Sequence, residues 1–95
     1  MAAYAIADVE VTDPAKFQEY VSQVPATVEK YGGKYIVRGG AIEKTEGDWV
    51  PSRMVVIEFE SMEQLEKWYH SQEYSGPMQL CHQSANANVL FVEGV

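Results

Sequence analysis

The sequence has few of the residues that mark secreted, nucleic-acid-binding or membrane-binding proteins. A single cysteine, Cys81, excludes an intramolecular disulfide bond. Seven basic residues stand scattered against 14 acidic ones, and the formal charge of -7 repels phosphate backbones and anionic lipid heads. We therefore expect no nucleic-acid partner and no membrane partner.

Long apolar runs and metal-ligand spacings are also missing. No apolar run approaches the roughly 20 residues that cross a bilayer, and residues 1–11 lack the basic and apolar regions of a secretory signal. These features predict a cytoplasmic protein. His70 and His82 have no second histidine or cysteine at ligand spacing, and no glycine-rich phosphate loop is present, so we expect no metal and no cofactor.

The first third of the chain reads as a strand followed by a helix. Residues 2–11 alternate between two faces, as a strand does. Asp13 before Pro14 predicts a helix start, because the carboxylate accepts from a free amide and proline needs no donor there. Proline in a helix interior costs about 3 kcal/mol, so we expect a kink or break at Pro25. Glycines 32 and 33 predict the helix end.

The rest of the chain supplies two more strands, a second helical region and a last strand. We expect strands at 34–44, 53–60 and 86–93, and a helix from Ser61 to about His70 that begins with a Ser61 and Gln64 capping box. Gly76 followed by Pro77 predicts that 71–84 forms two short helical pieces. The order β-α-β-β-α-β predicts one α+β domain over residues 1–95, of ferredoxin-like type, with a four-stranded antiparallel sheet and helices on one face.

The sheet face without helices is the informative surface of this fold. Strand alternation places on it Tyr4, Ile6, Asp8, Ile36, Arg38, Met54, Val56, Glu58, Asn88, Leu90 and Val92. The opposite set, which includes Val55, Ile57, Phe59, Val89 and Phe91, is expected under the helices. An open face with this many apolar residues favours a second copy packed against it, so we expect a homodimer.

Three charged residues are candidates for chemistry on that open face. If the first and third strands are parallel neighbours, Asp8 lies beside Glu58, and the hairpin places Arg38 opposite Glu58. Two carboxylates beside an arginine can orient or deprotonate a small substrate. The alternative is that these charges form ion pairs that set the register of a dimer.

Aromatic residues outside the helical stripes are candidates for ligand contact. Trp49 lies in a polar connector and Tyr74 in the interrupted helical segment, so both are free to meet a flat ligand or a partner subunit, and Tyr4 adds a third aromatic ring. Trp68 lies on a helical stripe and is expected in the core. Cys81 is expected to be a small buried apolar residue.

Short motifs spread over the whole chain carry a family resemblance. They are T-D-P after the first strand, K-Y-G-G-K-Y-I-V-R-G-G, the connector E-G-D-W, V-V-I-E-F, W-Y-x-S-x-E-Y and the closing V-E-G-V. Together they resemble the domain of unknown function 1330 (DUF1330) family of the dimeric α+β barrel superfamily. The resemblance implies a ferredoxin-like subunit whose open sheet face meets its twin in a barrel. It also singles out Arg38, Gly39, Trp49, Glu58, Trp68, Ser71 and Tyr74 as family motif positions.

The same resemblance sets the functional expectations. The superfamily includes cofactor-free monooxygenases, muconolactone-type isomerases and haem-handling enzymes, whereas the family itself has no established reaction. We expect a small organic ligand at the dimer barrel, with a proton handled by Glu58 or Asp8 and the ligand held by Arg38, Trp49, Tyr74, Tyr4 and Ser71. The basic residue typical of relatives near Cys81 is missing. The alternative is a non-catalytic stress, regulatory or scaffold module.

Overall fold

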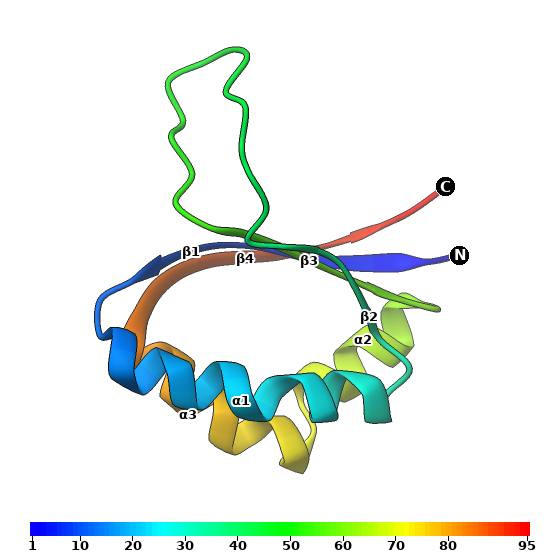
Figure 1. The fold of residues 1–95 in the computed structure, drawn as a ribbon. Helices are drawn as coiled ribbons and strands as arrows, with labels where there is room; N and C mark the ends of the chain where they lie inside the picture. The colour runs from blue at the N-terminus through cyan, green and yellow to red at the C-terminus, as the bar shows by residue number, and fades with distance from the viewer.

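A computed structural model describes all 95 residues as a four-stranded sheet with three helices on one face (Figure 1). The elements are β1 (Ala3–Val11), α1 (Pro14–Lys30), β2 (Lys34–Arg38), β3 (Met54–Phe59), α2 (Met62–Tyr69), α3 (Gln72–Ser84) and β4 (Ala85–Glu93). The strand order is β2-β3-β1-β4, and every neighbouring pair is antiparallel. The predicted α+β ferredoxin-like fold is confirmed.

The predicted helix starts are also confirmed by their caps. The Asp13 carboxylate accepts a hydrogen bond from the Lys16 amide at 3.2 Å, and the Ser61 hydroxyl accepts one from the Gln64 amide at 3.1 Å. Each cap satisfies an amide that the first turn of a helix leaves without a partner. Helix α1 ends before Gly32, whose φ of 77° lies in the left-handed region that glycine enters without strain.

The two interior prolines do not break their helices, so the expected break at Pro25 and the two helical pieces expected over 71–84 were wrong. Helix α1 runs through Pro25, and α3 runs as one helix through Pro77. Val24 and Val28 on either side of the first proline are buried in the core, and Pro77 is itself buried. Burial of each apolar side chain contributes about 1.5–3 kcal/mol, which offsets the roughly 3 kcal/mol cost of an interior proline.

Strand β2 differs from the expectation in length and in register. It ends at Arg38 rather than near Lys44. Tyr35 pairs with Ile57 while Val37 pairs with Val56, so Ile36 is an extra residue that forms a β-bulge. A one-residue slip moves each following side chain to the other face of a sheet. Arg38 consequently faces the helices, and its placement on the open face was wrong.

The expected charge cluster does not form, because β1 and β3 are antiparallel rather than parallel. Glu58 pairs with Tyr4 across the two strands, while Asp8 pairs with Met54 near the opposite end. On its other side Glu58 pairs with Lys34 instead of Arg38. Antiparallel strands bring the start of one to the end of the other, which separates the two carboxylates along the sheet.

The core lies between the sheet and the helices at the end of the domain near α2. It comprises Ala3, Ala5, Val24, Val28, Ile57, Phe59, Leu65, Trp68 and Tyr74. Trp68 is 3% exposed, and its indole nitrogen donates to Thr27 Oγ1 at 3.0 Å, so its predicted core position is confirmed. Glu73 joins α3 to the end of α1, because its carboxylate accepts from both Lys30 Nζ and Tyr31 Oη.

Residues 39–53 form a long connector between β2 and β3 that rises from the sheet on the side away from the helices (Figure 1). Asp8 fixes its second half to β1. One carboxylate oxygen accepts from the Trp49 indole nitrogen at 3.0 Å, and the other accepts from the Ser52 amide at 2.9 Å. None of the three helices combines the length and apolarity that a membrane span requires.

Candidate functional site

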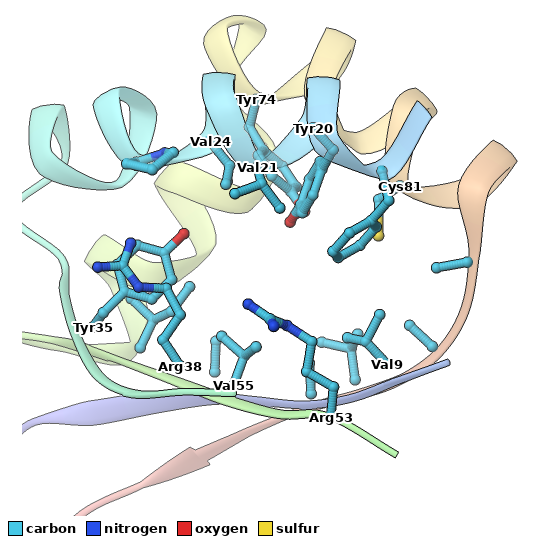
Figure 2. A pocket seen from close by; sticks show the side chains of 18 of the residues that line it. Val9, Tyr20, Val21, Val24, Tyr35, Arg38, Arg53, Val55, Tyr74 and Cys81 are labelled. Atoms are coloured by element: carbon cyan, nitrogen blue, oxygen red, sulfur yellow. The ribbon is translucent and has the colours of Figure 1, made fainter. Parts of the chain in front are cut away.

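A cavity of about 260 Å³ lies between the covered face of the sheet and helices α1 and α3 (Figure 2). Of the 21 residues that line it, 17 are hydrophobic, so the cavity suits a largely apolar occupant. Its floor contains alanines at 5, 7, 85 and 87, on β1 and β4. Beyond Ala5, where Ala3 pairs with Phe59, the buried Phe59 ring fills the corresponding space. Small floor residues at alternate strand positions therefore explain why this space stays open.

Two arginines bring positive charge into this apolar cavity. Arg38 at the end of β2 and Arg53 just before β3 both line it, and Figure 2 shows the Arg53 guanidinium pointing inward and the Arg38 guanidinium beside Tyr35 at one side of the cavity. No Asp or Glu is among the lining residues. The two ion pairs of the molecule, Lys30 with Glu73 and Lys67 with Glu63, involve neither arginine. The cavity therefore presents positive charge within a protein of formal charge -7.

The two guanidinium groups differ in their surroundings. The Arg38 guanidinium carbon lies 4.3 Å from the centroid of the Tyr35 ring, a cation–π contact that contributes about 0.5–1 kcal/mol at an exposed site. Arg53 Nε is buried and has no hydrogen-bond partner in the protein. A buried donor without a partner costs about 1–3 kcal/mol, so an acceptor that enters the cavity, whether a ligand atom or a water, stabilises Arg53 Nε.

A pair of tyrosines faces the arginines from the helical side of the cavity (Figure 2). The Tyr20 and Tyr74 hydroxyl oxygens lie 3.1 Å apart and share one hydrogen bond. Burial raises the pKa of both phenols above the ordinary value of 10, so both stay protonated at neutral pH. When one hydroxyl donates to the other, the second retains a proton that it can donate to a ligand.

Helix α3 adds Cys81 and His82 to the cavity wall. Burial raises the pKa of the Cys81 thiol, so it is mainly protonated and a weak nucleophile at neutral pH. His82 is exposed at the edge of the cavity. No three His, Cys, Asp or Glu side chains in the structure come together as a metal-binding group.

The structure separates the site residues expected from the sequence into two groups. Arg38 and Tyr74 line the cavity. The others do not: Ser71 caps α3 by accepting from the Tyr74 amide at 3.1 Å, and Trp49 is 62% exposed on the connector.

Both candidate carboxylates lie on the open face of the sheet, away from the cavity. Glu58 accepts from the Tyr4 hydroxyl at 3.1 Å. Asp8 accepts from the Ser52 amide, the main cause that lowers the pKa of this carboxyl, and from the Trp49 indole. Each carboxylate is thus hydrogen-bonded within the open face.

Arg53, Tyr20 and Tyr35 are cavity residues that were not predicted. Arg53 has the same strand parity as Val55 and Ile57, which were expected under the helices, so the alternation of β3 already indicated its direction. Tyr20 belongs to the apolar stripe of α1 and was interpreted as core. Tyr35 pairs with Ile57 across β2 and β3, so the two side chains lie on the same, covered face of the sheet.

Comparison with known proteins extends the sequence and fold evidence. A sequence model of the family described as "Domain of unknown function (DUF1330)" matches residues 2–95. No curated protein matches the sequence.

Several solved structures share the fold. RPA0582, a protein of unknown function from Rhodopseudomonas palustris, superposes with a TM-score of 0.78 at 10% identity, covering 99% of this chain and 82% of that chain. The methylated form of RPA0582 gives a TM-score of 0.80 at 10% identity, covering 99% and 81%. SnoaB, a cofactor-independent oxygenase from Streptomyces nogalater, gives 0.73 at 9% identity, covering 99% and 93%. At these identities the likeness shows the fold alone.

Proposed function

We propose that this chain, which belongs to the DUF1330 family, binds a small organic anion in the cavity between its helices and its sheet. The observation that carries the proposal is the pair of guanidinium groups, Arg38 and Arg53, in an apolar cavity that contains no carboxylate. Hydrogen bonds to charged groups contribute about 1.5–3 kcal/mol each, and more where water is excluded. An anion therefore gains more here than a neutral molecule of the same shape.

The cavity volume limits the size of this anion. Drug-sized ligands occupy pockets of about 300–1,000 Å³, and this cavity holds about 260 Å³. A single aromatic ring or a short branched chain that carries one acidic group fits these dimensions. The tyrosine pair opposite the arginines suits a second oxygen on the same molecule.

Ligand-dependent thermal unfolding tests this proposal. Benzoate is expected to raise the melting temperature in a concentration-dependent way, because a ligand at 100 times its Kd stabilises the folded state by about 2.7 kcal/mol. Benzyl alcohol, which has the same ring without the charge, is the matched control. Equal effects of the two compounds, or no effect of either, would contradict an anion site and favour the scaffold alternative.

A second candidate is cofactor-independent oxygenation of the bound molecule. The fold shared with SnoaB supports it, and so do the guanidinium groups, because they stabilise the negative charge of an enolate or phenolate in an apolar cavity. Phenylpyruvate is a suitable probe, since it has one ring, a carboxylate and an enolisable carbon. Oxygen uptake above that of the buffer, lowered in Arg38→Gln, is expected. A rate equal to that of the buffer would eliminate this candidate.

The partner that we propose is a second copy of the chain on the open face of the sheet. Leu90 is 56% exposed there and Val92 43% exposed, and Val37 lies on the same face. The connector rises on this side too, where it would meet the partner (Figure 1). Apolar side chains on one face favour a symmetric dimer. The cytoplasmic location stays a prediction.

Sedimentation equilibrium tests the dimer. A dimeric mass at micromolar concentration is expected for the wild type, and Leu90→Asp is expected to shift the mass toward the monomer, because it buries a charge at the interface. A wild-type protein that is monomeric under these conditions would contradict the proposed assembly.

A further inference from the structure

We infer that Arg53 selects the ligand, by binding a carboxylate along the edge formed by its Nε and Nη2 atoms. The inference deepens the proposed function and rests on it. Arg53 Nε is buried and makes no hydrogen bond within the protein, although its guanidinium points into the cavity (Figure 2). Nε is therefore the cavity's buried donor without a protein acceptor.

The geometry of the Nε and Nη2 hydrogens of Arg53 indicates which kind of acceptor they bind. The Nε and Nη2 hydrogens of an arginine are parallel, and they match the two oxygens of a planar carboxylate in a bidentate pair. A lysine in the same place carries the charge as a point and has no such fork. The group that Arg53 recognises thus presents two anionic oxygens side by side, and a carboxylate, whose charge lies on two oxygens only, matches a single fork of this kind.

Gly39 fixes the position of the Arg53 guanidinium by packing against one of its faces. A Cβ on Gly39 would lie 2.6 Å from Arg53 Nη1 and 2.9 Å from its Cζ, so the guanidinium packs directly on the glycine backbone. The same Cβ would lie 3.3 Å from Nη2, so Gly39 covers one face of the guanidinium near Nη1 and leaves the edge formed by Nε and Nη2 uncovered. Gly39 also has a φ of 69°, a conformation that side chains disfavour. Gly39 is therefore a positioning residue for Arg53.

The backbone of Arg53 is fixed from the open side of the sheet. Its carbonyl accepts from the Val9 amide at 2.8 Å, and the preceding Ser52 amide donates to Asp8 at 2.9 Å. At the other end of the connector, the Gly39 amide donates to the Met54 carbonyl at 2.8 Å. Both ends of the connector are thus tied at the base of the cavity, and a preorganised arginine loses less entropy when it binds.

Arg38 has a different part in the same site. It is exposed, and its guanidinium stacks on the Tyr35 ring at 4.3 Å. The Tyr35 ring covers one face of the Arg38 guanidinium. The positive charge of Arg38 still contributes to the electrostatic potential of the cavity. Arg38 therefore strengthens binding of any anion, whereas Arg53 distinguishes a carboxylate from other anions.

Isothermal titration with benzoate and benzenesulfonate tests this assignment. Both probes carry one negative charge on the same ring, but the sulfonate is not planar. The wild type is expected to prefer benzoate. Arg53→Lys is expected to weaken benzoate binding by about tenfold and to remove the preference, because the bidentate pair is lost. Arg38→Lys, the matched control, keeps a point charge and is expected to retain the preference.

The outcomes separate this inference from the proposed function. If the wild type binds neither probe, the proposed function fails. If the wild type binds benzoate, and Arg53→Lys keeps both the affinity and the preference, the site stands and the role of Arg53 is overturned. Arg53→Gln repeats the comparison should the lysine variant fail to fold, as circular dichroism would show. Gly39→Ala is expected to lose the same preference, because it displaces the Arg53 guanidinium.

Discussion

The charged side chains on the two faces of the sheet differ in their partners. Carboxylates on the open face accept hydrogen bonds from the protein, whereas the arginines on the covered face have no carboxylate partner. On the open face, the Asp8 and Glu58 carboxylates accept hydrogen bonds from the connector and from Tyr4. On the covered face, Arg38 and Arg53 have no carboxylate partner, and one of their nitrogens is buried without an acceptor.

This difference indicates which polar groups maintain the fold and which are left for a ligand. A carboxylate whose oxygens already accept protein hydrogen bonds is a structural group first, and it would have to break those bonds to act on a substrate. A guanidinium in an apolar cavity without an acceptor gains from any anion that enters. The proposed binding site therefore belongs to the covered face, although the charged candidates from the sequence were placed on the open one.

The largest expected effect comes from removing a buried apolar side chain from the covered face. Phe59 is 1% exposed on the covered face, and Phe59→Ala is expected to lower the free energy of unfolding by about 3–5 kcal/mol, because it leaves a cavity in the core. Val92→Ala on the open face is the control, with an expected change below about 1 kcal/mol where the protein is monomeric. Urea denaturation measures both. Similar losses in the two variants would mean that the faces are equally buried.

A smaller effect concerns the open-face pair of Tyr4 and Glu58. The hydrogen bond to Glu58 is the main cause that raises the pKa of Tyr4 above 10, and the Glu58 charge adds to it. Glu58→Gln is therefore expected to lower the pKa of Tyr4 toward 10, measured by NMR of tyrosine labelled at the ring carbon that bears the hydroxyl. Tyr20 is the internal control, because burial on the other face raises its pKa. An unchanged Tyr4 titration would show that the two residues do not interact.

The smallest effect is a pH-dependent release of the connector. Hydrogen bonds, first from the Ser52 amide and then from Trp49, lower the pKa of Asp8 below 3.8. The ionised Asp8 carboxylate therefore contributes its full stabilisation above about pH 3.8. This stabilisation is lost as the pH falls through the lowered pKa that Asp8 has in the folded state. Below that pH, the Trp49 indole proton is expected to exchange faster with solvent in NMR spectra, as it should in Asp8→Ala at neutral pH. The Trp68 indole proton, bonded to Thr27, should not change.

Periodicity and caps were sufficient to predict most of the fold. The alternation of residues 2–11, the Asp13 and Ser61 caps and the order of elements led to the observed sheet and helices. The continuity of α1 and α3 was not predictable from proline alone, because it depends on tertiary burial of the neighbouring turns.

The site was less predictable, because it depends on one bulge and one register. Ile36 is the extra residue that turns Arg38 toward the helices, and its neighbours in the sequence do not distinguish it from a regular strand residue. The separation of Asp8 from Glu58 follows from the antiparallel pairing of β1 and β3. The direction of Arg53 could have been predicted from the sequence, because strand alternation places it on the same face as Val55 and Ile57. A basic residue at the start of a strand is usually exposed, however, so Arg53 did not stand out.

The most direct measurement of the central claim is the NMR signal of the Arg53 side-chain Nε–Hε group during titration with benzoate. The account predicts a saturable shift of this signal, in the direction of a stronger hydrogen bond, and a smaller shift for Arg38. Benzyl alcohol should leave both signals in place. Benzoate-induced shifts confined to open-face residues such as Tyr4 and Trp49, with Arg53 unaffected, would contradict the account.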